Sequence, residues 1–167
     1  NLVCVSGDNG IFVYNGAIAQ KLTIDTPAAV RLAQSGSGSM NPGSYACAIS
    51  WLRNGLESAV SELAKLELQT KGGINIRLPL CLDESITHVR LYMSDENGGE
   101  LRQAEDYSID QLSLSLSRLP ELGRSAQFQH LSPMPSGNFL KVWRGRLLVV
   151  RRNVLHFSEA MAYHLTD

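Results

Sequence analysis

Four stretches of this chain alternate apolar with polar or small side chains at a period of two, and this pattern limits the possible folds most. The stretches are residues 44–52, 74–80, 88–94 and 112–117. In the first, one side carries Tyr45, Cys47, Ile49 and Trp51, and the other carries Ala46, Ala48 and Ser50. Helices do not produce this alternation, because their apolar positions recur every three to four residues. The sequence therefore predicts an all-β fold with a β-sandwich at residues 42–119.

The two ends of the chain have a different pattern, in which short apolar runs are joined by tight turns. Asn15-Gly16 is a strong hairpin signal, because both residues tolerate the positive φ of a type I′ turn. Residues 147–150 are apolar at every position, which is typical of a strand covered on both faces. We therefore expect residues 1–26 and 139–167 to form one β-meander body with the sandwich inserted between them.

The connections between these parts follow from composition. Residues 28–43 are rich in Ser and Gly, which predicts a flexible connection or an exposed loop. Residues 120–138 contain Pro120, Pro133 and Pro135 and are predicted to be a long irregular connection. The predicted division is thus 1–41 for the first part of the meander and a linker, 42–119 for the sandwich, and 120–167 for a linker and the second part of the meander.

The segment 56–68 permits two readings. Its apolar residues would suit an amphipathic helix, with Ala59, Val60, Leu63 and Ala64 on one side. Its neighbours on both sides are predicted strands. We therefore expect a loop followed by a strand near residues 64–68.

Composition narrows the class of protein. The 167 residues have a formal net charge of -1, which disfavours a nucleic-acid-coating or membrane-surface protein. No apolar run approaches the roughly 20 residues that span a bilayer. The chain starts at Asn1, which suggests that it is a piece of a longer polypeptide. Cys4, Cys47 and Cys81 are widely spaced and are expected to be buried thiols in a reducing compartment, with a Cys47–Cys81 disulfide as the alternative.

No known catalytic or metal-binding motif is present in the sequence. The four histidines have no HxH or HxxxH spacing, and no Gly-x-Ser-x-Gly motif surrounds a serine. The carboxylates at Asp95 and Glu96 stand beside a glycine turn but lack the ligand spacing of an EF-hand. We therefore assign no catalytic, cofactor-binding or metal-binding residues and expect a protein that is not an enzyme.

A group of basic residues near the C-terminal end is the one candidate site. Its members are Lys141, Arg144, Arg146, Arg151 and Arg152. They flank a turn and end a strand in the predicted meander, so several guanidinium groups are expected near the ends of one hairpin. Such a group can be solubilising charge, a salt-bridge patch for a protein partner, or a nucleic-acid contact. The lack of an interleaved aromatic stripe disfavours nucleic acid.

Several segments resemble structural proteins of tailed bacteriophages and prophages. Residues 143–159 (WRGRLLVVRRNVLHFSE) and 163–167 look like the repeated blade phrase of their propeller-like β-meanders, and residues 10–16 with 22–25 resemble the same phrase. Residues 43–51, 54–58 and Ser61 look like the last hairpin of a fibronectin type III-like insert, whose earlier strands would be 73–80, 88–94 and 112–119, in permuted order. The chain departs from the phrase at Ala160, where a proline is usual.

The resemblance implies a fibronectin type III-like β-sandwich inserted in a propeller-like β-meander. It also implies a structural subunit of a virion, in the tail or at the head–tail junction, assembled in the cytoplasm of a bacterial host. Its partners would be other virion proteins or further copies of itself, with neither membrane nor cofactor. Because the two ends supply few strands and residues 147–150 are apolar on both faces, we also expect the meander to be stable only with chain beyond Asp167 or with partner subunits.

Two other classes of function stay open. An adhesin or carbohydrate-binding sandwich would expose aromatic residues such as Trp51, Tyr92 or Tyr107 at one loop end. A hydrolase would gather carboxylates such as Glu105 and Asp106 in a pocket.

Overall fold

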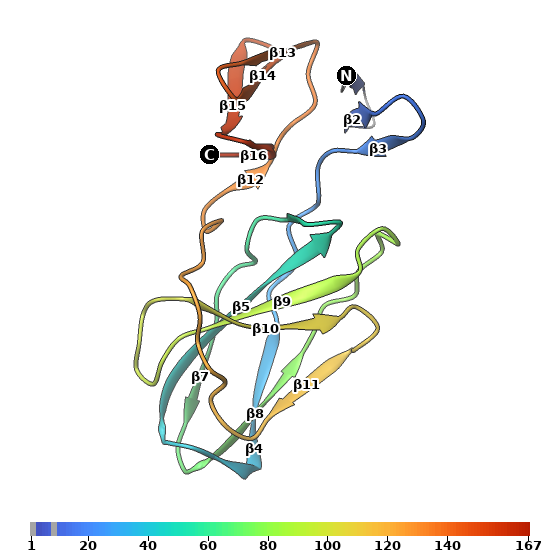
Figure 1. Cartoon of the computed structure of the whole chain (residues 1–167). Coiled ribbons are helices and arrows are strands. Elements are labelled where there is room, and N and C mark those ends of the chain that lie inside the picture. Colours follow the sequence, from blue (N-terminus) through green and yellow to red (C-terminus); the bar gives the residue numbers. More distant parts are fainter. Residues whose placement is uncertain (1–2, 8–9) are drawn as a thin grey trace. The chain divides into compact units, whose positions relative to one another are not determined.

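The computed structural model describes residues 3–7 and 10–167, and these residues form strands and no helix (Figure 1). The strands belong to several antiparallel sheets, none of them closed, so the all-β prediction is confirmed. The chain divides into two compact units. One consists of Asn1–Thr26 together with His130–Asp167, and the other is Pro27–Gln129.

The unit Pro27–Gln129 contains two sheets in the two layers of a β-sandwich (Figure 1). Its strands are β4 (Arg31–Met40), β5 (Gly43–Arg53), β6 (Leu56–Glu57), β7 (Ala64–Leu68), β8 (Gly72–Arg77), β9 (His88–Met93), β10 (Arg102–Ser108) and β11 (Ser113–Leu116). One sheet has the order β10-β9-β5-β6, with β7 also paired to β5, and the other has the order β11-β8-β4.

The strand register explains the alternation in the sequence. Ile49 lies opposite Leu91, and Cys47 opposite Met93, so these side chains share one face of the β5–β9 pair. All four are fully buried. The small residues on the other face of β5, among them Ala46 and Ala48, are buried as well. This strand is therefore covered on both faces.

The prediction of a flexible loop at residues 28–43 is wrong for Arg31–Met40, which form β4 and pair with β8. The physical reason is close backbone packing. A Cβ added to Gly38 would lie 2.3 Å from the carbonyl oxygen of Gly72, and one added to Gly73 would lie 2.4 Å from that of Leu116. Glycine is needed here because backbones approach each other, and the ladder shifts register between Ser35 and Met40. The sandwich therefore begins with β4, before residue 42.

The segment between β6 and β7 is a loop and then a strand, as predicted, since β7 spans Ala64–Leu68. Two serines attach the loop to β5. Ser58 Oγ accepts a hydrogen bond from the Trp51 amide at 2.9 Å, and Ser61 Oγ accepts one from the Ile49 amide at 3.0 Å. These side chains continue the hydrogen bonding of the sheet, which holds the segment extended and excludes a helix.

Part of the predicted linker after residue 119 also belongs to the sandwich. The amide of Ala126 donates to the carbonyl of Leu101 at 2.9 Å, and the amide of Val60 donates to the carbonyl of Phe128 at 3.1 Å. These bonds explain why this unit continues to Gln129.

The other unit is built from both ends of the chain. Its strands are β1 (Val3–Gly7), β2 (Gly10–Tyr14), β3 (Ala19–Lys21), β12 (Ser132–Pro133), β13 (Phe139–Trp143), β14 (Arg146–Arg151), β15 (Val154–Glu159) and β16 (Ala162–Thr166). They form a sheet of order β1-β2-β3 and a sheet of order β12-β16-β15-β14-β13. Ile11 from β2 packs in one core with Met134, Leu147 and Val149, so the two terminal segments share a core.

The turns of this unit differ from each other. The β2–β3 hairpin is present at Asn15-Gly16, but positive φ occurs at Gly16 (102°) and not at Asn15, so the predicted type I′ turn is wrong. Instead, Asn15 Oδ1 accepts hydrogen bonds from the amides of Ala17 and Ile18, both at 3.0 Å. Two positive φ angles do occur between β13 and β14, at Arg144 (47°) and Gly145 (75°).

Candidate interaction surface

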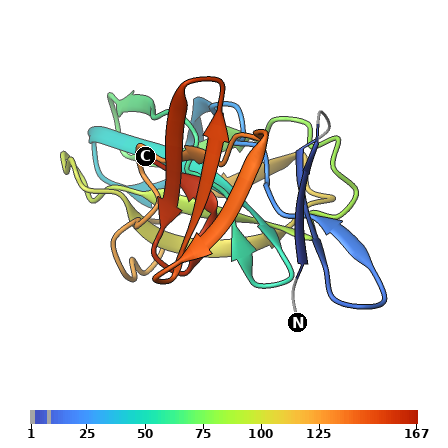
Figure 2. The same ribbon diagram turned by 90° about the horizontal axis from the view of Figure 1, so that it is seen from above.

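The strands β13, β14 and β15, orange to red in Figure 2, form an antiparallel sheet. One face of this sheet lies in the core of its unit, and the other lies outside it. Leu147 and Val149 point into the core and are fully buried. The strand register places the alternate residues on the opposite face, which we call the outer face. It consists of Phe139, Lys141, Trp143, Arg146, Leu148, Val150, Leu155 and Phe157.

The outer face is largely apolar and open. Phe139, Trp143, Leu155 and Phe157 are each 51–56% exposed, and Leu148 and Val150 between them are partly exposed. Among the described residues of this unit, no layer covers these side chains, although large apolar residues are usually turned inward. Contiguous exposed apolar surface of this kind marks interaction sites.

The basic residues predicted as a site divide into two groups. Lys141 and Arg146 lie on the outer face, and Arg144 is in the turn at the same end of β14 as Arg146. Arg151 and Arg152 lie at the other end of β14. A strand rises about 3.3 Å per residue, so the two ends of β14 are roughly 17 Å apart. The five cations thus surround the sheet and do not form a single cluster.

Two of these arginines cover aromatic rings. The guanidinium carbon of Arg144 lies 4.6 Å from the centroid of the Trp143 ring, and that of Arg146 lies 5.8 Å from the centroid of the Phe157 ring. Arg146 Nη1 also donates to the carbonyl oxygen of Ser158 at 2.7 Å. Cation–π contacts of this kind hold the guanidinium groups against the apolar surface.

The charge of this region is one-sided. Residues 139–157 contain five Lys or Arg residues and no Asp or Glu, within a chain of net charge -1. Sequence reasoning found the cations and predicted that residues 147–150 need cover on both faces, but it did not place Leu155 and Phe157 beside them. Leu155 and Phe157 pair with Val150 and Leu148, which belong to the apolar run 147–150.

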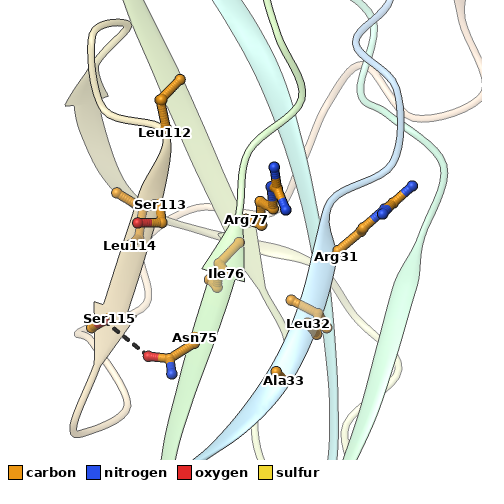
Figure 3. Close-up of a pocket in the computed structure, with 10 residues that line it drawn as sticks. All are labelled: Arg31, Leu32, Ala33, Asn75, Ile76, Arg77, Leu112, Ser113, Leu114 and Ser115. Carbon is orange, nitrogen blue, oxygen red and sulfur yellow. Dashed lines mark hydrogen bonds between the residues drawn. The ribbon is translucent and has the colours of Figure 1, made fainter.

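The sandwich has a second surface feature, an open depression of about 610 Å³ over β4, β8 and β11 (Figure 3). Arg31 lies directly opposite Arg77 in the β4–β8 ladder, and Ser113 lies opposite Arg77 in the next strand. Below them Ser115 Oγ donates to Asn75 Oδ1 at 2.9 Å. Like charges directly opposite each other destabilise a sheet, so this row is a source of weak local repulsion.

A partly buried ionic network lies on the sheet that contains β5 and β9. Arg90 forms a double hydrogen bond to Asp106, with Nε–Oδ1 at 2.7 Å and Nη2–Oδ2 at 2.8 Å, and its Nη1 lies 2.7 Å from Glu57 Oε2. Glu57 also accepts hydrogen bonds from Ser50 and from the Tyr92 hydroxyl. Hydrogen bonds to Asp106 raise the pKa of Arg90 above its ordinary value. Burial, followed by the hydrogen bond to Glu57, raises the pKa of Tyr92.

The residues considered above for a hydrolase or a sugar-binding site are engaged or buried. Asp106 is engaged by Arg90, and Glu105 accepts a hydrogen bond from the Tyr107 hydroxyl at 2.9 Å. Burial and then the contact with Glu105 raise the pKa of Tyr107 to about 12. Trp51 and Tyr92 are buried, so neither ring is free to stack on a sugar.

No disulfide joins Cys47 to Cys81, and the Cys81 thiol donates to the carbonyl oxygen of Asp83 at 3.7 Å. Cys47 is buried, and burial raises the pKa of its thiol to about 12. In the described part of the chain, no three His, Cys, Asp or Glu residues are placed to hold a metal ion. The described residues also include no helix with the length and hydropathy to cross a membrane.

The chain matches no protein-family model, no curated protein and no solved structure.

Proposed function

We propose that this chain is a non-enzymatic structural subunit of a tailed-phage virion, in the tail or at the head–tail junction, and that it acts through contacts with other proteins. The observation that carries the proposal is the outer face of β13–β15. A sheet with one face in a core and large apolar side chains half exposed on the other is half of a layered structure.

The arrangement of the strands supports this function. The strands β13, β14, β15 and β16 follow one another in a four-stranded antiparallel meander, which is the form of a propeller blade. Residues 143–159, which carry the resemblance to phage proteins, run from the end of β13 to the end of β15. A blade normally packs its faces against neighbouring blades, and this chain leaves one face open.

The sandwich adds a second line of support. The hairpin of β5 and β7 lies next to β9, while β8 pairs with β4 and β11 in the other sheet. This arrangement suits a fibronectin type III-like sandwich in which the last hairpin of the fold comes early in the chain, as the resemblance implies.

Protein composition of purified phage particles would test the proposal. Particles released from the bacterium that produces the protein are purified on a density gradient and analysed by mass spectrometry. We expect peptides of this chain in a constant ratio to the major capsid protein across the particle peak. A distribution that follows soluble host proteins and not the particles would reject a virion function.

The alternative of an adhesin or carbohydrate-binding sandwich has less support. Its expected aromatic platform would need Trp51 or Tyr92 at the surface, and both are buried. Tyr107 is partly exposed, but it is engaged with Glu105. A glycan array probed with the purified chain is expected to show no specific binding.

A further inference from the structure

We propose that the outer face of β13–β15 docks a β-sheet of a different protein, one that presents an apolar face with Asp or Glu carboxylates opposite Lys141 and Arg146. This inference rests on the proposed function in one respect, because it requires a protein partner. It adds the location of the contact and the chemistry of the partner.

The apolar part of the argument comes from shape and exposure. The outer face spans three adjacent strands and carries six apolar side chains, of which four are 51–56% exposed. A flat, three-stranded apolar surface is matched by a second sheet, since sheets pack face to face at about 10 Å through interdigitated side chains. A lone helix would cover less of its width.

The charges decide which sheet fits. Lys141 and Arg146 stand on the outer face, and no carboxylate occurs anywhere in residues 139–157. A second copy docked through the same face would bring cations against cations, and such contacts are costly when water is excluded. Carboxylates on a different protein would neutralise these cations at the moment of docking. The occupant is therefore a heterologous, acidic partner.

Single-stranded nucleic acid fits the face less well, although aromatic rings and cations are both present. Nucleic-acid platforms use rings that are free to stack on bases. Here Arg144 and Arg146 already lie over the rings of Trp143 and Phe157. The face also carries the aliphatic side chains Leu148, Val150 and Leu155. Aliphatic side chains match a protein core and offer nothing to bases.

Site-specific photo-crosslinking tests the proposal. A benzoylphenylalanine replaces Leu155 on the outer face, or Leu82 as a control that is exposed on the sandwich. The full protein is produced in its natural host and irradiated, and the crosslinked peptides are sequenced. We expect the Leu155 position to crosslink at least about tenfold more than Leu82, to an alternating apolar strand that carries Asp or Glu.

Charge reversal supplies the second arm. The variant Lys141→Glu changes an exposed side chain that forms no hydrogen bond or ion pair with the described residues, so folding is expected to be preserved. It is expected to lower the crosslink yield at position 155 about tenfold, whereas Lys141→Arg should keep it. Crosslinks to another copy of the chain, crosslinks to nucleic acid, equal yields at both positions, or a yield insensitive to Lys141→Glu would each overturn the proposal.

These outcomes are separable from those for the virion function. If the chain is present in particles but Leu155 gives no crosslink, the docking face is wrong and the virion function stands. If Leu155 crosslinks to an acidic sheet of a protein that is absent from particles, the docking face stands and the virion function is rejected.

Discussion

The two units each contain a sheet with a second face outside its main core, and they treat that face in opposite ways. In the sandwich, the second face of β5 carries Ala46 and Ala48, which pack in a cluster with Val60, Tyr92 and Leu101. Further chain from Ala126 and Phe128 packs against this cluster. In the other unit, the outer face of β13–β15 carries large apolar side chains that are half exposed.

The comparison shows that side-chain size determines what can cover a face. Alanine is small, so other segments of the same chain can approach this face closely. Two of these segments also bind each other, because the Val60 amide donates a hydrogen bond to the Phe128 carbonyl. The charged groups on that face are satisfied by each other, through Arg90, Glu57 and Asp106. Large residues such as Trp143 hold a covering layer farther away, and a complete second sheet is needed to bury them.

The largest expected effect comes from breaking the charge network on the covered face. Arg90→Met removes the guanidinium group that pairs with both Glu57 and Asp106, and Glu57 is almost fully buried. Removing one partner of a buried ion pair costs about 3–5 kcal/mol of unfolding free energy. Urea unfolding followed by Trp51 fluorescence in a Trp143→Phe background measures this for the sandwich.

The matched control is Arg77→Met, because Arg77 is exposed and lies opposite another arginine. We expect a change within about 0.5 kcal/mol, or a slight gain from relief of repulsion. Equal losses for Arg77→Met and Arg90→Met would show that the network contributes nothing particular to the covered face.

A second prediction concerns Cys47, which reports how well the sandwich is closed. Its pKa is raised from 9 to about 12 by burial, so at pH 8 its thiolate fraction is about a thousandfold below that of an ordinary thiol. In a Cys4→Ser, Cys81→Ser background, reaction with a disulfide reagent should be slower than in urea by at least about that factor. Rapid labelling of the native protein would show that the sandwich opens.

The same shift has a consequence for stability. The folded-state pKa lies above the unfolded one, so the native state favours the neutral thiol. Its contribution is complete below pH 9 and is lost as the pH rises from 9 to about 12. The variant Cys47→Ala should therefore lose less stability than the parent chain between these pH values.

The sequence allowed much of the fold to be predicted, because period-two alternation directly reflects which strand face is buried. This held for residues 44–52, where both the large and the small side are now seen to be covered. It failed for Arg31–Met40, since Ser and Gly signal flexibility and close backbone packing alike. Only the pairing with β8 distinguishes close packing from flexibility here, and local composition does not predict pairing between strands so far apart in the sequence.

The candidate surface was predicted less completely. The cations from Lys141 to Arg152 could be found from charge alone, but their division between the two ends of β14 required the register. In the sequence, Leu155 and Phe157 could be assigned to neither face of their strand. Whether such a residue is covered depends on the layer next to it. When another protein supplies that layer, the apolar pattern of this chain cannot predict it.

A third prediction compares the effect of a larger side chain at a covered strand position and at an exposed one in the sandwich. Ala48→Leu inserts a larger side chain between β5 and the segment that covers it, and overpacking of this kind costs about 1–3 kcal/mol. Ala33→Leu makes the same change at an exposed position of β4 and should cost less than about 0.5 kcal/mol. Urea unfolding of both variants checks the pair, and similar costs would mean that the second face of β5 is loosely covered.

The smallest effect is expected on the outer face itself. Leu155→Ala removes a side chain that is 56% exposed, and the unfolding free energy should change by no more than about 0.5 kcal/mol. Leu147→Ala removes a fully buried leucine from the other face of the same sheet and should cost about 2–5 kcal/mol. Native-state hydrogen exchange of the β14 amides measures both. A loss above about 1 kcal/mol for Leu155→Ala would mean that this chain already covers the residue, and the contrast between a closed face and an open one would then disappear.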